Sequence, residues 1–558
     1  MVRLRVVLLV FYLWLFFIVF KLFYWQILSH EDLSLAADKQ HLMQVILPAG
    51  RGEITTSDGS LLVGNQMKYQ VHADPKKILG NPLNIKNLAQ LLGMDESSVS
   101  AKLNPDLVWV SLKRRIDKET VDAIKSLKLD GLGFEDEEVR FYLEGSMSAH
   151  LLGFVGYSYD GTSQGYFGLE GYYDRMLKGK AGFLRQAKDA MGNPILAGNQ
   201  KRVSTQDGRT LKLHLDKTIQ FVVEKKLEEG VQKYGAKGGS IVVMRPKDGG
   251  ILAMASLPSY DPGSYADFSS DYYKNPVVAE TYEPGSTFKP VVMAAALNEG
   301  LVGPDTVFDE PGPVEVGGYT IRTWNDKYSG TITATQILEK SSNVGMVQVG
   351  RKLGKEKLLS YIKKFGFGQE TGVDLQEETN PLLRPDDGWK EIDLATTTFG
   401  QGIAVTPMQM VGAMAAIANG GRLMEPQVVD AIIDKNGKKI DIEPKVVNEV
   451  ISPATARILT NMLVSSVDKS EAKFAKLKGY RIAGKTGTAQ IPVAGHYDTQ
   501  KTIASFIGFA PADEPKFVML VTLQEPTSSP WGSETAAPLF FSIAKDLLAY
   551  YNIPPTEQ

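Results

Sequence analysis

The longest hydrophobic segment of the chain lies at its N-terminus. Residues 6–20 form an unbroken apolar run, Lys21 interrupts it, and mostly apolar residues follow. A run of this length approaches the roughly 20 apolar residues that span a bilayer. Because Arg3 and Arg5 precede it, the positive-inside rule places the N-terminus in the cytoplasm. The pattern predicts a transmembrane signal anchor over residues 6–28.

A cleaved signal peptide is the alternative interpretation of this segment. A faint small-x-small cleavage sequence at residues 34–36 lies in a polar, helix-like stretch well past the apolar run, which favours an uncleaved anchor. We therefore expect a cytoplasmic tail over residues 1–5, a single membrane pass, and an extracytoplasmic location for everything that follows.

The segment after the anchor alternates short strand-like and helix-like patches. A turn at residues 57–60 precedes a short apolar strand. Residues 85–92 and 118–127 have helical periodicity. Residues 197–209 are polar and mark the approach to a second domain. These patterns predict a β-rich first domain over residues 40–205.

The remainder of the chain shows a different mixture of helices and strands. Two apolar strands, residues 240–244 and 251–255, flank a Lys-Asp-Gly-Gly turn typical of a hairpin. Helical stretches cover residues 286–297 and much of 333–353. Three further strands and a closing amphipathic helix lie at residues 480–489, 504–509, 517–523 and 536–551. This order predicts an α+β domain over residues 210–552, with one antiparallel sheet flanked by helices.

The composition excludes several classes of site. A net charge of −3 gives no electrostatic basis for nucleic-acid binding. The absence of cysteine excludes disulfides, thiolate metal sites and a cysteine nucleophile. The six histidines show no pair at metal-ligand spacing, so we expect no metal, no cofactor and no His-based triad. His150 is expected to be an ordinary hydrogen-bonded histidine of the fold.

The best candidate for chemistry is the segment 283–290, Glu-Pro-Gly-Ser-Thr-Phe-Lys-Pro. A serine hydroxyl is a weak nucleophile until a base takes its proton. On a helix, Ser286 and Lys289 share one face about 5–6 Å apart at Cβ, so the amine can reach the hydroxyl. A lone Ser-x-x-Lys occurs by chance in many surface helices, and the motifs downstream therefore decide its meaning.

Two further motifs follow in order, Ser-Ser-Asn at residues 341–343 and Lys-Thr-Gly-Thr at 485–488. Ser-x-x-Lys, Ser-x-Asn and Lys-Thr-Gly form the motif set of penicillin-binding proteins and class A β-lactamases. The longer matching segments are residues 280–290, 340–346, 399–402, 405–407 and 483–490. On these segments the chain resembles the class B penicillin-binding proteins, and more narrowly the division-specific (FtsI-type) peptidoglycan D,D-transpeptidases, over nearly its whole length.

The resemblance implies an architecture and a reaction. The fold is an N-terminal transmembrane helix, an elongated β-rich pedestal domain of the dimerisation type, and a serine β-lactamase-like transpeptidase domain. The donor is a peptidoglycan stem peptide ending in D-alanyl-D-alanine. Ser286 attacks the penultimate carbonyl and releases D-alanine, and an amine of a neighbouring stem peptide resolves the acyl-enzyme. β-Lactams would acylate Ser286 covalently.

The resemblance also implies the roles of the first two motifs. Lys289 would act as the base, which requires a neutral amine; burial and the positive charge of Lys485 would lower its pKa. Ser341 would relay the proton to the leaving amine. Asn343 would hydrogen-bond the donor peptide through its amide.

In the third motif, Lys485 is expected on a strand edge, and Gly487 permits close approach of the substrate backbone. The hydroxyls of Thr486 and Thr488 would bind the terminal carboxylate. The backbone N–H groups of Ser286 and Thr488 would form the oxyanion hole, which typically contributes about 3–4 kcal/mol per donor.

Several alternatives remain open at this stage. They are an elongation-type transpeptidase, a D,D-carboxypeptidase, a β-lactamase, a β-lactam sensor and a non-catalytic scaffold of the wall-synthesis complex. The anchor and pedestal disfavour the carboxypeptidase and β-lactamase readings. The partners that the resemblance implies are a polytopic SEDS-family glycosyltransferase and division proteins.

Overall fold

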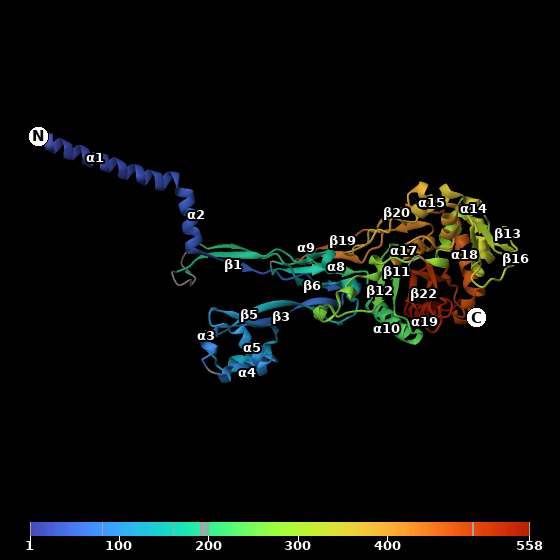
Figure 1. Ribbon diagram of the computed structural model, residues 1–558, viewed down its shortest axis with the longest axis horizontal. Coiled ribbons are helices and arrows are strands. Elements are labelled where there is room, and N and C mark those ends of the chain that lie inside the picture. Colours follow the sequence, from blue (N-terminus) through green and yellow to red (C-terminus); the bar gives the residue numbers. More distant parts are fainter. Residues whose placement is uncertain are drawn as a thin grey trace. The chain divides into compact units, whose positions relative to one another are not determined.

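The computed structural model describes residues 2–80, 82–159, 161–189, 195, 200–493 and 496–556 (Figure 1). The chain forms two compact units. One consists of Met1–Arg51 and Lys178–Gly208, and the other of Gly52–Leu177 and Arg209–Gln558. Each unit has two segments because the chain leaves the first unit after Arg51 and returns to it at Lys178.

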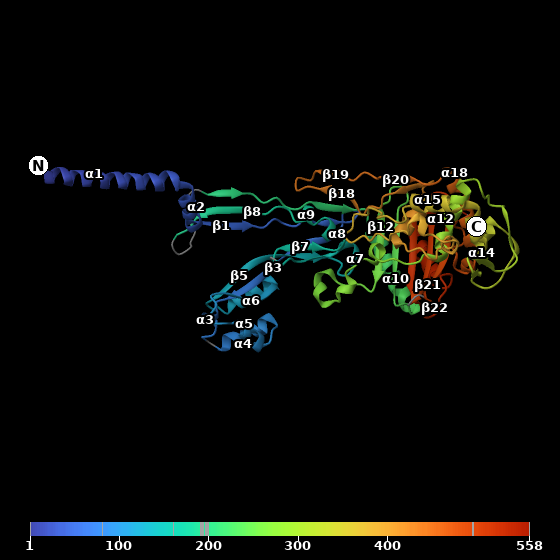
Figure 2. The same ribbon diagram turned by 45° about the horizontal axis from the view of Figure 1, so that its top comes forward.

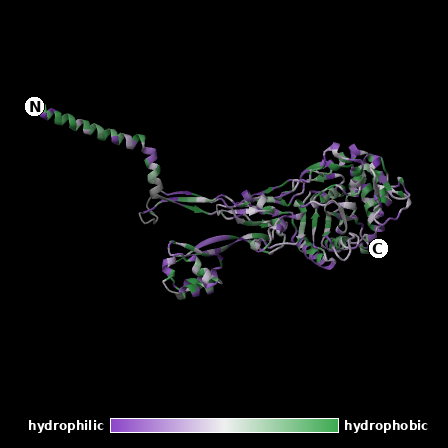
Figure 3. Cartoon of the chain, viewed as in Figure 1, coloured by the Kyte–Doolittle hydropathy of each residue, from purple (hydrophilic) through white to green (hydrophobic). Residues whose placement is uncertain are grey.

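The first unit begins with one long apolar helix. α1 (Val2–Phe23) continues as a π-helical segment, Tyr24–Leu28, and α2 (His30–His41) follows. The helix Val2–Leu28 has a mean hydropathy of 2.7 and is long and apolar enough to cross a membrane; Figure 3 shows α1 mostly in the green of hydrophobic residues. The predicted anchor at residues 6–28 lies within this helix.

A small sheet completes the first unit. β1 (Leu42–Leu47) pairs antiparallel with β8 (Gly182–Ala187), and β8 pairs antiparallel with β9 (Lys201–Val203). The sheet joins the segment directly after α2 to the segment that returns from the second unit, so the anchor is tied to folded β-structure.

The N-terminal part of the second unit is a twisted antiparallel group of strands with small helices. β3 (Leu61–Ala73) pairs with both β4 (Val110–Ile116) and β5 (Leu132–Tyr142). The helices beside these strands are α3 (Pro75–Ile78), α4 (Pro82–Leu92), α5 (Glu96–Lys102) and α6 (Lys118–Ser126). Their apolar faces share one core, which includes Leu88, Val99, Leu112 and Ile124. The strand and the two helices predicted for this region are therefore present.

One sheet links this part to the C-terminal part of the same unit. β10 (Thr210–Leu213) pairs parallel with β2 (Ile54–Thr55) and antiparallel with β18 (Val429–Ile433). The strand order is β19-β18-β10-β2-β3-β4, with β19 at Lys439–Asp441 and β5 on β3. Because backbone hydrogen bonds cross from β10 to strands on both sides, the two parts are held by secondary structure as well as by side chains.

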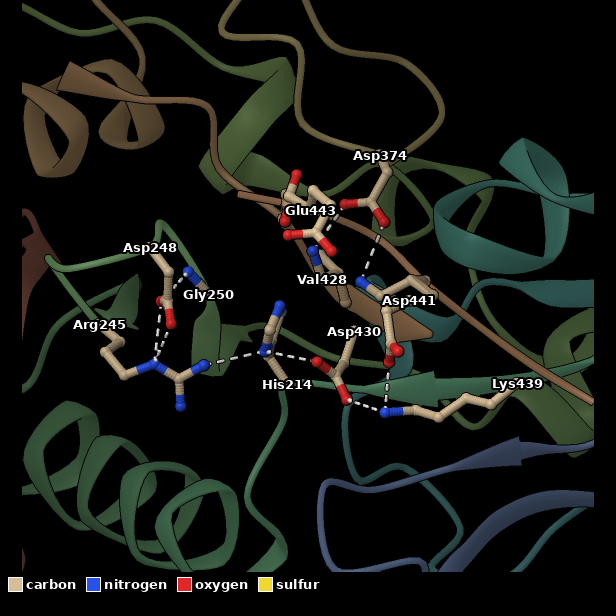
Figure 4. Close-up of polar contacts among 12 residues, drawn as sticks. His214, Arg245, Asp248, Gly250, Asp374, Val428, Asp430, Lys439, Asp441 and Glu443 are labelled. Carbon is tan, nitrogen blue, oxygen red and sulfur yellow. Dashed lines mark hydrogen bonds and ion pairs between the residues drawn. The ribbon is translucent and has the colours of Figure 1, made fainter. Parts of the chain in front are cut away.

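A polar cluster lies beside this shared sheet (Figure 4). Arg245 Nη2 donates to His214 Nδ1 at 3.0 Å, and Asp430 Oδ1 lies 3.8 Å from the same nitrogen. Arg245 Nε also contacts both carboxylate oxygens of Asp248, at 2.9 and 2.7 Å. Burial, followed by the positive charge of Arg245, lowers the pKa of His214. The cluster therefore favours neutral His214.

The C-terminal part is built on a five-stranded antiparallel sheet in the order β12-β11-β23-β22-β21. Its strands are β11 (Gly238–Met244), β12 (Ile251–Leu257), β21 (Ala483–Val493), β22 (His496–Ala510) and β23 (Phe517–Gln524). α10 (Lys217–Tyr234) and α19 (Ala536–Tyr550) pack on one face through a core that includes Phe506, Phe540 and Phe541. Both helices are labelled in Figure 1, and Figure 2 shows α10 with the strands β21 and β22 of this sheet. The predicted hairpin, the three late strands and the closing helix are all present.

The other face of the sheet carries the larger hydrophobic core. Its helices are α11 (Pro276–Ala279), α12 (Lys289–Asn298), α13 (Ala334–Glu339), α14 (Asn343–Leu353), α15 (Lys355–Lys364), α16 (Glu391–Thr397), α17 (Pro407–Ala418) and α18 (Pro453–Lys469). The remaining short elements are α7 (Ala149–Leu152), α8 (Gly168–Tyr172), α9 (Asp174–Leu177), β6 (Phe154–Tyr157), β7 (Ser163–Tyr166), β13 (Val307–Glu310), β14 (Val314–Val316), β15 (Tyr319–Ile321), β16 (Gly330–Thr333), β17 (Arg422–Met424) and β20 (Val446–Glu449).

Two predicted helices differ from those in the structure. The helix predicted from residue 286 begins as a 3-10 turn, Gly285–Phe288, and becomes α-helical only at Lys289. The helical stretch predicted across residues 333–353 is two helices, α13 and α14, separated at Ser341, whose φ is 54°. A left-handed backbone conformation cannot continue a right-handed helix. Both deviations fall at residues of the candidate site.

Candidate active site

The 3-10 turn Gly285–Phe288 places Ser286 at the surface of a cavity. Gly285 has a φ of 56°, and its N–H donates to the carbonyl of Gly400 at 2.9 Å. A Cβ on Gly285 would lie 3.1 Å from the carbonyl oxygen of Thr488. Glycine is therefore required here by both its conformation and its close packing. The turn brings Ser286 beside the strand that carries Thr488.

A hydrogen-bond network connects the residues of the first two motifs. Ser341 Oγ donates to Ser286 Oγ at 3.0 Å. Lys289 Nζ donates to Ser341 O at 2.6 Å and to Asn343 Oδ1 at 2.9 Å, and it lies 3.2 Å from Ser341 Oγ. In the described part of the chain, Lys289 makes no hydrogen bond to Ser286 itself. The link that sequence spacing predicted between these two side chains thus runs through Ser341.

Lys289 is fully buried, and its environment disfavours a positive charge. Its side chain is 0% exposed. Burial lowers the pKa of Lys289 well below its ordinary value, the positive charge of Lys485 lowers it further, and the carboxylate of Glu310 acts in the opposite direction. The neutral amine that a catalytic base requires is therefore favoured by the site.

The second motif derives its geometry from the break between α13 and α14. Ser342 caps α14, since its Oγ accepts from the N–H of Gly345 at 2.9 Å. Asn343 begins the helix and is held at both ends of its amide: Oδ1 accepts from Lys289, and Nδ2 donates to the carbonyl of Arg322 at 3.0 Å. The Asn343 amide is therefore rigidly oriented beside Ser341.

The third motif lies on the edge strand β21, where Lys485 is 1% exposed. Burial lowers the pKa of Lys485 to about 7, against the opposing charge of Glu471. Its amine lies 3.3 Å from both the carbonyl and the hydroxyl of Thr486. Because its pKa lies near 7, Lys485 can change charge near neutral pH. In the same motif, Thr488 Oγ1 accepts from the N–H of Gly532 at 3.0 Å.

All three motifs meet at one cavity of about 920 Å³. Each predicted site residue except Lys289 lines it: Ser286, Ser341, Asn343, Lys485, Thr486, Gly487 and Thr488. Lys289 lies beneath the lining and reaches it through Ser341 and Asn343. Both predicted oxyanion-hole residues, Ser286 and Thr488, thus line the same cavity, which suits attack by Ser286 on a carbonyl.

The cavity also has lining residues that the sequence analysis missed, among them Glu310, Arg322, Trp324, Glu471 and Trp531. The rings of Trp324 and Trp531 meet edge to face with centroids 5.0 Å apart. Glu310 ends the short strand β13, Glu471 begins a 3-10 helix, and the other three lie in loops, so no periodic pattern marks any of them. The one sequence feature that could have pointed to this part of the site is an aromatic residue within a loop rich in Gly, Ser and Asn, as at Trp324 and Trp531.

Other candidate chemistry does not gather around the site. Among the described residues, no group of three or more His, Asp or Glu side chains is placed to hold a metal ion. His150 is buried against the ring of Tyr260, with centroids 5.5 Å apart, and does not line the cavity. Burial lowers the pKa of His150 to about 4.

Comparison with known proteins identifies the two regions. Residues 239–548 match the penicillin binding protein transpeptidase domain, and residues 46–213 match the penicillin-binding protein dimerisation domain. The chain therefore belongs to the penicillin-binding proteins with a transpeptidase domain. Since the dimerisation domain precedes that domain, it is a class B penicillin-binding protein, as the motifs predicted.

Relatives cover nearly the whole chain. Stage V sporulation protein D of Bacillus subtilis is 37% identical over 544 residues, covering 96% of this chain and 83% of the relative. Peptidoglycan D,D-transpeptidase FtsI of Escherichia coli is 31% identical over 548 residues, covering 95% and 88%. Penicillin binding protein 3 of Mycobacterium tuberculosis, crystallised with aztreonam, is 28% identical with a TM-score of 0.71, covering 92% and 99%. These likenesses confirm the predicted fold class and family.

Proposed function

We propose that this protein is a peptidoglycan D,D-transpeptidase that works through an acyl-enzyme on Ser286. The observation that carries the proposal is the hydrogen-bond network from Ser286 through Ser341 to the buried amine of Lys289. It joins a nucleophile to a base whose neutral form is favoured. The names of the relatives supply the substrate class: several are peptidoglycan D,D-transpeptidases.

Acylation begins when Ser286 Oγ attacks the penultimate carbonyl of a D-alanyl-D-alanine terminus. For this step both hydroxyls turn, so that Ser286 donates to Ser341 Oγ and Ser341 donates to the neutral amine of Lys289. The Ser286 proton then passes to Ser341, whose own proton passes to Lys289, so the base need not touch the nucleophile. The carbonyl electron pair moves onto oxygen, where the backbone N–H groups of Ser286 and Thr488 stabilise it. The motif residues thus accept the proton that leaves Ser286 and stabilise the negative charge that develops on the carbonyl oxygen.

Collapse of the tetrahedral intermediate releases D-alanine. The leaving nitrogen takes a proton from Ser341, and Lys289 returns its proton to Ser341. The amine of a second stem peptide then attacks the acyl-enzyme by the reverse proton route and forms the cross-link. Asn343 orients the donor backbone, while Lys485, Thr486 and Thr488 hold its terminal carboxylate.

The cellular role is also part of the proposal. The helix Val2–Leu28 anchors the protein in the cytoplasmic membrane, with its N-terminus inside and the catalytic part outside. The chain serves septal wall synthesis together with a polytopic SEDS-family glycosyltransferase and division proteins. An elongation role, a sporulation role like that in the name of the Bacillus subtilis relative, and a non-catalytic scaffold are the alternatives.

Covalent labelling tests the reaction. Full-length protein in detergent is incubated with a fluorescent penicillin beside Ser286→Ala, and the labelled peptide is mapped. Stable label on Ser286 that is absent from the variant is expected. A folded wild-type protein that takes no label would move the scaffold role to the front.

A second assay separates transpeptidation from carboxypeptidation. A pentapeptide donor is supplied with and without an amine acceptor, and D-alanine release and cross-linked product are measured. The proposal expects cross-linked product with acceptor. D-Alanine release that forms only hydrolysed tetrapeptide at every acceptor concentration contradicts it.

A further inference from the structure

Glu310, at the end of β13, is a buried carboxylate that belongs to none of the three motifs. Its side chain is 1% exposed, yet the residue lines the active-site cavity. No described Lys, Arg or His side chain forms an ion pair with it. A buried, ionised carboxylate is costly unless hydrogen bonds and nearby positive charge stabilise it. The groups that contact Glu310 therefore indicate its role.

Glu310 accepts two hydrogen bonds, one of them from the second motif. Ser342 Oγ donates to Glu310 Oε1, and the N–H of Ser329 donates to Oε2 at 3.1 Å. Ser342 lies between Ser341 and Asn343, which both accept hydrogen bonds from Lys289. The carboxylate thus holds the middle residue of the turn whose two outer residues bind the catalytic amine.

Two charged groups act on the pKa of the Lys289 amine. Lys289 and Lys485 are both buried, at 0% and 1% exposed. Glu310 raises the pKa of Lys289, whereas Lys485 lowers it. The carboxylate of Glu471 acts on Lys485 instead. Glu310 is therefore the negative charge that opposes Lys485 at the catalytic amine.

We propose that Glu310 is a positioning residue and the counter-charge for the Lys289 ammonium that forms during acylation. The inference rests on the proposed function. As the Ser286 Oγ–carbon bond forms and the carbonyl electron pair moves to oxygen, one proton leaves Ser286 and one arrives at Lys289 through Ser341. A positive charge thereby appears in a buried pocket beside Lys485. The Glu310 carboxylate offsets it without contacting substrate.

The test is the pH profile of acylation in Glu310→Gln, which keeps the shape of the side chain and removes its charge. The second-order rate constant for benzylpenicillin is measured with full-length protein in detergent. Without the counter-charge, Lys289 loses its proton at lower pH, so the acidic limb should move down by about 1–3 pH units. The plateau at high pH should fall roughly tenfold, because the amine is a weaker base.

Two control variants separate charge from shape. Ser342→Ala breaks the contact but keeps the Glu310 charge, so its acidic limb should stay at the wild-type pH. Glu471→Gln removes a carboxylate that acts on Lys485, and its limb should move less than that of Glu310→Gln. A Glu310→Gln profile with an unmoved limb, or with the same shift as Glu471→Gln, overturns the proposal.

The proposed function and this inference fail in different ways. If the wild-type protein is not acylated on Ser286, the proposed function fails. If the wild-type protein is acylated but the variants do not show the pH profiles stated above, the proposed role of Glu310 fails. Should Glu310→Gln not fold, Glu310→Asp keeps the charge and disturbs the contact: a limb at the wild-type pH supports the counter-charge, and a displaced limb overturns it.

Discussion

The hydroxyl of Ser341 donates a hydrogen bond to the hydroxyl of Ser286 at 3.0 Å, although 55 positions separate the two residues in the chain. Ser341 also contacts the amine of Lys289 through both its hydroxyl and its carbonyl. Ser341 therefore lies between Ser286, the proposed nucleophile, and Lys289, the proposed base. Removing it should affect proton transfer more than folding.

The first prediction concerns Ser341→Ala. Without the hydroxyl, no described side chain links Ser286 to Lys289, and general-base assistance is lost. The rate of Ser286 acylation by penicillin should fall roughly 100-fold or more. Stopped-flow or gel-based labelling measures the rate, and circular dichroism reports the fold.

Ser329→Ala is the matched control for that experiment. Ser329 lines the same cavity, and among the described residues its hydroxyl has one hydrogen bond, accepted from Lys340 at 2.9 Å. We expect it to be acylated at nearly the wild-type rate. Equal losses in the two variants would mean that Ser341 has no special place in the proton path.

The second prediction concerns Gly487→Ala. A Cβ at this position would collide with Ser505 Oγ and would lie 2.8 Å from the methyl group of Thr287. The new methyl group should push the turn carrying Ser286 away from β21. We expect a loss of about 1–3 kcal/mol in unfolding free energy from overpacking and at least a roughly tenfold slower acylation.

Thermal unfolding and penicillin labelling test this second prediction together. Gly312→Ala is the control, because nothing lies within 4 Å of a Cβ there. It should change neither quantity. Normal acylation by Gly487→Ala would show that the separation between β21 and the turn is not critical.

The sequence predicted the strands of the five-stranded sheet and singled out the three motifs because both are encoded locally. The hairpin of β11 and β12, for example, follows from two apolar runs around a Gly-Gly turn. The three motifs are short strings in which each residue type has a chemical reason. The structure brings them to one cavity, as the resemblance implied.

What the sequence missed depends on contacts between distant positions. Glu310 contacts the second motif through Ser342, which is 32 positions away, and no local pattern marks that pair. The parallel pairing of β10 with β2 joins Leu211 to Ile54 across most of the first domain. The left-handed Ser341 was also missed, because helical periodicity continues on both sides of it.

The third prediction concerns the pH dependence of stability through His150. Burial lowers its pKa to about 4 in the folded protein, below the roughly 6.5 of an unfolded histidine. Its contribution to stability is therefore fully present above pH 6.5 and is lost as the pH falls toward 4. Between pH 7 and 5 the loss should be about 2 kcal/mol.

Unfolding by urea at pH 7 and pH 5 measures the contribution of His150. In His150→Gln the difference between the two pH values should shrink by about that amount. His72→Gln replaces a partly exposed histidine beside Glu135 and is the matched control; it should leave the difference intact. A His150→Gln protein with an unchanged difference would contradict the prediction.

The fourth prediction concerns Lys485, whose pKa burial lowers to about 7. Below that pH its ammonium can attract the terminal carboxylate of the donor; above it the charge is lost. The KM for a D-alanyl-D-alanine donor should therefore rise above pH 7, approaching tenfold per pH unit at the limit where binding requires the charge.

Lys485→Arg keeps its charge throughout this range, since arginine does not lose its proton in proteins. Its KM should be higher at pH 7 because the larger side chain fits the buried site poorly, but it should stay flat between pH 7 and 9. A parallel rise of KM in both proteins would assign the titration to another group, and a flat wild-type KM would mean that the threonine hydroxyls hold the carboxylate without help from the lysine charge.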